Sequence, residues 1–128
     1  MVVMKRTIEN LEDIRFMVDT FYARVRADGL IGPLFEARIG DRWPEHLEKM
    51  YSFWQTVLLE EHTYRGAPFR PHADLPVHLE HFERWVELFE ENMLEHFTGE
   101  KADEALTRAG KMAQMFHSKR EFLRRHGA

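Results

Sequence analysis

The sequence contains no cysteine. This absence excludes disulfide bonds, thiolate metal sites, iron–sulfur clusters, thiol catalysis and the CxxCH motif of covalent cofactor attachment. No apolar run approaches the length needed to span a bilayer, and the first residues, MVVMKRTIEN, lack the extended apolar core of a signal peptide. We therefore expect a cytoplasmic protein with no membrane partner.

Positive charge is also in short supply. The 18 Lys and Arg residues are outnumbered by 22 Asp and Glu residues, which gives a formal net charge of −4. No basic stripe is interleaved with aromatic residues, so nucleic acid is not an expected partner. The hydrophobic fraction of 44% is typical of globular proteins, and 128 residues suffice for one domain, residues 1–128, with a real core.

The motifs of several enzyme classes are missing as well. HExxH, GxSxG, GxGxxG and the Walker loop do not occur. No histidine has a glutamate three residues before it, so the Glu-x-x-His pairs of di-iron carboxylate bundles are absent too. We interpret His78 and His81 as a solvated pair on one helix face, with binding of a stray transition metal as the alternative. His117 with Glu121 is interpreted as an ordinary i,i+4 surface pair.

Helical periodicity is what the sequence does contain, and it predicts an all-α fold. Asn10 has the side chain of an N-cap, and apolar residues follow it at helical spacing as far as Asp28-Gly29. A turn and a short helix are expected over residues 30–35, with Gly40 ending the connection. Three longer helices should follow: Trp43 to about Leu59, Pro76 to Thr98-Gly99, and about Lys101 to Arg124.

The longest segment without helical periodicity runs from residue 61 to 76. Its three prolines make a stiff irregular loop that holds His72. Loops of this length are uncommon in compact domains and are usually functional or disordered. A histidine fixed ahead of a helix that bears Phe82 and Trp85 has the setting of an axial ligand for a flat apolar cofactor. A solvated loop histidine is the alternative.

Two further polar residues fall in line with apolar stripes. His46 lies four residues before Met50, on the same predicted helix face, and Tyr22 lies within or beside the stripe of the first helix. The alternatives are a partly buried histidine and a core tyrosine, each bonded to backbone. In an antiparallel arrangement, His46, Tyr22 and Trp85 converge on one cavity opposite His72, and a haem fits such a cavity.

Three stretches, FYARVRADGLIGPLF, EHLEKMYSFWQTVLL and PFRPHADLPVHLEHFERWVELFEE, together resemble the truncated haemoglobins, specifically their third group. The resemblance covers nearly the whole chain and implies a shortened globin fold, a 2-on-2 helical sandwich around a haem. It implies that His72 is the proximal iron ligand and Tyr22 the distal tyrosine. It also implies that His46 is the gate of the distal helix and Trp85 a donor to bound ligand.

The implied cofactor is non-covalent haem b. The residues expected to contact it, besides His72 and Trp85, are Phe35, Met50, Phe53, Trp54, Phe69, Leu75, Phe82, Met112 and Phe116. Arg65 and Arg70 are candidate partners of its propionates.

The function implied is binding of O2, CO, NO or similar small ligands at the iron. Three distal donors predict slow dioxygen release, which favours O2, NO or peroxide chemistry, or sensing, over bulk oxygen transport. Peroxidase-like or NO-dioxygenase-like turnover stays open and would need an unidentified reductase. We expect a monomer or weak dimer. The alternative from another class is a cofactor-free helical interaction module, which would be colourless.

Overall fold

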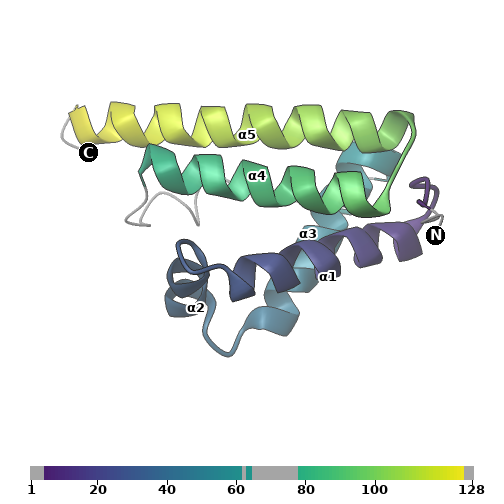
Figure 1. The fold of residues 1–128 in the computed structure, drawn as a ribbon, viewed down its shortest axis with the longest axis horizontal. Coiled ribbons are helices and arrows are strands. Elements are labelled where there is room, and N and C mark those ends of the chain that lie inside the picture. Colours follow the sequence, from purple (N-terminus) through teal and green to yellow (C-terminus); the bar gives the residue numbers. More distant parts are fainter. Residues whose placement is uncertain (1–4, 62, 65–77, 126–128) are drawn as a thin grey trace.

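The structure, a computed structural model, describes residues 5–61, 63–64 and 78–125, except for the side chains of residues 120 and 122–124. Five helices follow one another there (Figure 1), and no strand occurs among these residues. Their bounds are α1 (Leu11–Ala27), α2 (Gly32–Ile39), α3 (Trp43–Leu59), α4 (Leu79–His96) and α5 (Glu100–Arg125). The predicted all-α fold is confirmed.

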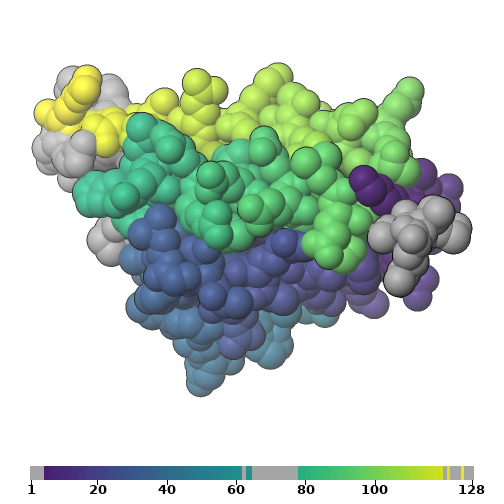
Figure 2. Space-filling view, in the orientation of Figure 1, coloured from purple at the N-terminus to yellow at the C-terminus, as the bar shows by residue number. Residues whose placement is uncertain are grey.

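The four long helices form two crossed pairs. In Figure 1, α4 and α5 run side by side in opposite directions, while α1 and α3 cross beneath them. The tertiary contacts follow this arrangement, since α4 packs on both α5 and α1, and α1 packs on α3. Figure 2 shows α4 as a green band between α5 and the purple-to-blue N-terminal helices.

Helix α1 begins and ends where its sequence predicts. The Asn10 side chain accepts a hydrogen bond from the Asp13 N–H at 3.1 Å, and Asp13 accepts one from the Asn10 N–H at 3.3 Å. This reciprocal capping box satisfies backbone donors that a helix start leaves free. At the other end, the carboxylate of Asp28 accepts the N–H groups of Leu30 and Ile31, at 3.0 Å each, and turns the chain into α2.

Close approach of α2 to α1 depends on Gly32. A Cβ atom at this position would lie 2.9 Å from the Arg26 carbonyl oxygen and 3.0 Å from that of Val25. Backbone atoms cannot move aside as a flexible side chain does, so glycine is required for this contact. The tight corner places the start of α2 against the end of α1, beside Tyr22.

Helix α4 ends two residues earlier than predicted, at His96 rather than at Thr98-Gly99. The reason is a non-local backbone pairing. Phe97 takes an extended conformation and forms an isolated bridge with Arg6, whose N–H donates to the His96 carbonyl at 2.8 Å. The Arg6 carbonyl in turn accepts the Thr98 N–H at 2.8 Å. The predicted helix start at Pro76 lies outside the described residues.

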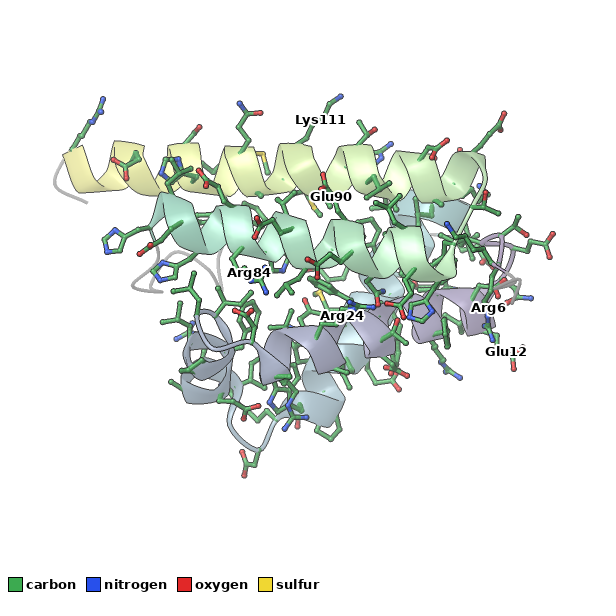
Figure 3. The ribbon with its side chains drawn as sticks, viewed as in Figure 1. Arg6, Glu12, Arg24, Arg84, Glu90 and Lys111 are labelled. Atoms are coloured by element: carbon green, nitrogen blue, oxygen red, sulfur yellow. The ribbon has the colours of Figure 1, made fainter. Side chains whose placement is uncertain are left out.

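One polar side chain, Asn92, is fully buried between α1 and α4. Its amide N–H donates to the Met17 carbonyl at 3.2 Å and to the Thr20 hydroxyl at 3.0 Å. Its amide oxygen accepts the Arg24 Nε–H at 3.1 Å, and Arg24, labelled in Figure 3, pairs further out with Glu95. Because every one of these bonds to Asn92 comes from α1, the amide fixes the register of the two helices.

No helix in the described ranges combines the length and apolar character that crossing a membrane requires.

Candidate functional site

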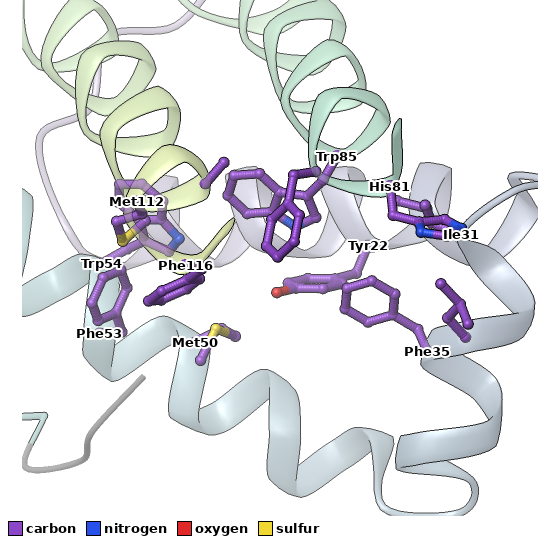
Figure 4. A pocket seen from close by; sticks show the side chains of 13 residues that line it. Tyr22, Ile31, Phe35, Met50, Phe53, Trp54, His81, Trp85, Met112 and Phe116 are labelled. Carbon is purple, nitrogen blue, oxygen red and sulfur yellow. The ribbon is translucent and has the colours of Figure 1, made fainter. Parts of the chain in front are cut away.

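A cavity opens where the two helix pairs meet, and each of the five helices contributes to its wall (Figure 4). Most of the lining side chains are aromatic or aliphatic, and the described lining contains no Lys, Arg, Asp or Glu. The lining residues are Tyr22, Ile31, Leu34, Phe35, Met50, Phe53, Trp54, His81, Phe82, Trp85, Met112, Ala113 and Phe116.

The structure brings together residues that the sequence assigned to one site. Every residue of the predicted site that falls within the described ranges lines this cavity, with the exception of His46. His72, Phe69 and Leu75 lie outside the described residues, as do the propionate candidates Arg65 and Arg70. The proximal ligand therefore stays a prediction.

Tyr22 is the most informative polar residue of the cavity. Its ring is held by edge contacts with Phe35 and His46, at centroid distances of 6.1 and 5.1 Å, and the residue is 6% exposed. Its hydroxyl, which points into the cavity in Figure 4, makes no hydrogen bond with the part of the chain that the structure describes. Burial raises the pKa of Tyr22 well above its ordinary value, so the hydroxyl remains a neutral donor.

A stack of three rings fixes the two tryptophans of the wall. Trp85 stacks on Phe89 at 5.7 Å and 14°, and Trp54 stacks on Phe89 at 5.3 Å and 18°. Phe21 closes the side of the stack with its ring at 89° to that of Trp85. Neither indole N–H has a hydrogen-bond partner among the described residues. Both are rigidly placed donors beside the cavity.

His46 lies one ring behind the cavity wall. Its half-buried imidazole contacts Tyr22 at 5.1 Å and Trp43 at 5.5 Å, both in edge-to-face geometry. Trp43 is 5% exposed and lies under the Arg26 guanidinium. The sequence analysis missed Trp43, although it precedes His46 by three residues and Met50 by seven, which places all three on one helix face.

The interpretation of His81 as one of a solvated pair is wrong. His78 is exposed, but His81 is half-buried and lines the cavity. Its Nδ1 accepts the His78 backbone N–H at 2.8 Å, which caps the start of α4. The interpretation of His117 and Glu121 as an i,i+4 pair is confirmed, at 3.7 Å, and the His117 ring also contacts Phe82.

Three other lining residues were not assigned to the site: Ile31, Leu34 and Ala113. The first two belong to the LIGPLF corner, where apolar residues around a glycine and a proline were a readable signal. Ala113 falls on the inward face predicted for the last helix. Its small side chain gave no reason to expect a cofactor contact.

A partly buried ion pair joins the α1–α2 corner to α4 beside the cavity. The Arg84 Nε–H, near the middle of Figure 3, donates to the Asp28 carboxylate at 2.8 Å, and this carboxylate is 8% exposed. Burial alone would raise the pKa of Asp28. The hydrogen bonds from Ile31, Arg84 and Leu30 outweigh it and hold the pKa below its usual value.

The lining fits a flat apolar macrocycle better than a bare metal ion. Among residues 5–61, 63–64 and 78–125, no group of three or more His, Asp or Glu side chains is placed to hold a metal. The walls offer aromatic faces, and the Tyr22 hydroxyl supplies a donor for a small polar ligand inside the cavity. A cavity that is mostly apolar and has a few fixed polar groups is typical of cofactor sites.

Comparison with known proteins gives concordant results. A family model described as bacterial-like globin matches residues 7–119. A group 3 truncated hemoglobin of Campylobacter jejuni is 38% identical over 119 residues, which cover 90% of this chain and 94% of that protein. The crystal structure of a group III truncated hemoglobin from Campylobacter jejuni matches with a TM-score of 0.83 and covers 91% of this chain and 94% of its own.

Proposed function

This chain belongs to the bacterial-like globin family, among the group III truncated haemoglobins, and from this premise we propose that it binds haem b in the cavity and takes up dioxygen. Membership of the family makes it a globin-type haem protein that binds ligands. The proposal adds His72 as the proximal ligand, and Tyr22 and Trp85 as donors to the bound ligand.

The Tyr22 hydroxyl, which an almost fully buried residue directs into the cavity, is the observation that carries this proposal. Burying a hydroxyl without a partner costs about 1–3 kcal/mol, so a core tyrosine normally finds a backbone acceptor. This hydroxyl has none among the described residues and faces a cavity instead. Its missing acceptor is therefore best supplied by a molecule that enters the cavity.

When bound, haem supplies an open iron position at which dioxygen and other diatomic molecules attach. The side chains around the iron then determine which bound ligand is stabilised. Tyr22 and Trp85 donate hydrogen bonds from fixed positions, which favours ligands that accept negative charge over those that do not. Their rings are locked by the contacts described above, so little ordering is required on binding.

Two rigid donors argue for slow dioxygen release, which suits reaction with O2, NO or peroxide, or sensing, better than bulk transport. An enzymatic reading requires a reductase as partner. The ring of His46 contacts Tyr22, so His46 is placed to control the access of ligands to the Tyr22 hydroxyl. We assign it the role of the gate residue.

The visible spectrum of the purified protein tests the cofactor and its ligand together. We expect a Soret band that shifts when carbon monoxide is added to the reduced protein. In His72→Ala the band should be lost or altered, because the iron loses its protein ligand. His78→Ala is the matched control, since His78 is exposed and does not line the cavity.

Two outcomes would contradict the proposal. A colourless protein that refuses added haemin would favour the cofactor-free helical module. An unchanged spectrum in His72→Ala would leave haem binding intact and move the proximal ligand elsewhere.

A further inference from the structure

His81 is the one imidazole of the described cavity wall, and it stands at the boundary between the cavity and solvent. It is half-buried, belongs to the first turn of α4, and lies beside Ile31 at the far end of the cavity from Met112 (Figure 4). The remaining described lining consists of apolar and aromatic side chains, and its Tyr22 hydroxyl points into the interior of the cavity and not towards this edge. A ligand with an apolar body and a charged edge would therefore find its polar partner here.

Hydrogen bonding fixes which nitrogen of His81 carries the proton. Nδ1 accepts the His78 backbone N–H at 2.8 Å, so it carries no proton while this bond is made. The neutral ring must then hold its proton on Nε2, which makes Nε2–H a single donor of defined direction. The capping bond thus orients the donor as well as starting the helix.

The nearest cationic side chain on the same helix, Arg84, is already hydrogen-bonded to carboxylates of this chain. Arg84, three residues further along α4, donates to Asp28 at 2.8 Å and to Glu87 at 3.1 Å. Its neighbours Glu80 and Glu83 are exposed and of the wrong sign for a carboxylate ligand. Of these side chains, His81 is the donor left at the cavity edge.

We propose that His81 Nε2–H donates to a propionate carboxylate of the haem and anchors the polar edge of the cofactor at the start of α4. This inference rests on the proposed function, because it requires haem in the cavity. Haem carries two carboxylates, and a carboxylate at a partly buried edge needs a hydrogen-bond donor to offset lost hydration. The positive end of α4 favours the same charge.

The test compares haem loss for two cofactors in two proteins. Wild type and His81→Leu are each loaded with haemin or with haemin dimethyl ester, whose propionates carry no charge. The rate of transfer to excess apomyoglobin is then measured. With haemin, His81→Leu should lose its cofactor about tenfold faster, which corresponds to the weaker end of hydrogen bonds to charged groups. With the ester, the two proteins should release it at nearly equal rates.

The ester also separates anchoring from capping, because His81→Leu removes the helix cap whichever cofactor is bound. His81→Gln, which keeps a side-chain N–H, should recover part of the difference. His78→Gln is the matched control and should change neither rate, because its backbone N–H remains.

Equal acceleration for both cofactors would show that His81 acts only on the helix and would overturn the proposal. No acceleration with haemin would overturn it as well. If wild type takes up neither cofactor, the proposed function itself fails, which is a different and recognisable result.

Discussion

Replacing Tyr22 by Phe tests the ligand-binding hypothesis most directly, because it removes one oxygen atom and leaves the packing of the ring. The residue is 6% exposed, and its hydroxyl faces the cavity and has no partner among the described residues. In the ligated protein it should donate to an acceptor that bears partial negative charge. Hydrogen bonds to charged groups contribute about 1.5–3 kcal/mol, which corresponds to a factor of roughly 10 to 100 in a rate.

We expect Tyr22→Phe to speed dioxygen dissociation by about tenfold, since Trp85 still donates and the lower end of this range applies. Stopped-flow displacement of dioxygen by carbon monoxide measures the rate. The haem-free variant should be as stable as wild type or more stable in urea, because the lost hydroxyl had no described partner to leave behind. Faster dioxygen dissociation with unchanged urea stability would show that the hydroxyl bonds to the ligand and does not stabilise the core.

Tyr51→Phe is the control for this experiment. Tyr51 lies on α3, and its hydroxyl donates to Asp19 on α1. Partial burial, and after it the bond to Asp19 and the charge of that carboxylate, raise the pKa of Tyr51 to about 12. Its loss should lower stability and leave the dissociation rate unchanged. An unchanged rate in Tyr22→Phe, or a loss of more than about 1 kcal/mol in its unfolding free energy, would refute the reasoning.

Three further outcomes are expected. Trp85→Phe keeps an aromatic ring in the stack but removes the indole N–H, so dioxygen should again dissociate faster in stopped flow, with little change in urea stability. Asn92→Leu should lower the unfolding free energy in urea by about 1–3 kcal/mol, because its partners, among them Arg24, lose their bonds inside the α1–α4 interface. Burial, then Arg24 and Arg6, hold the pKa of His96 below its usual value. The folded state therefore binds fewer protons, and stability present at about pH 7.5 should decline towards pH 5.5. His96→Gln should flatten this decline in urea titrations, and an equal slope in the variant would contradict it.

Local signals in the sequence were sufficient for most helix boundaries. The cap at Asn10, the Trp43-Pro44 start and the stop after Ala27 all depend on residues within one turn of the boundary, and the structure has each of them as predicted. The end of α4 was predicted two residues late. Phe97 takes an extended conformation and pairs with Arg6, which ends the helix at His96. That partner is far away in the sequence, and no local pattern contains it.

The same distinction explains what was predicted of the site. Tyr22, Met50 and Phe82 lie on apolar helix faces, and helical spacing alone directs them inward. His81 was assigned to solvent because its i,i−3 neighbour is another histidine. Which of the two histidines faces the cavity depends on how α4 is rotated against α1 and the α1–α2 corner. This rotation is set by contacts such as the ion pair of Arg84 with Asp28.

The three-ring stack has a consequence for optical work on this protein. All three of its tryptophans lie in or directly behind the cavity wall: Trp54 and Trp85 line the cavity, and Trp43 contacts Tyr22 at 5.7 Å. A chromophore that absorbs where indole emits would therefore quench the whole of the tryptophan fluorescence at once, with no distant residue left as background. The intensity of tryptophan emission therefore measures the fraction of molecules whose cavity is occupied, without any added label.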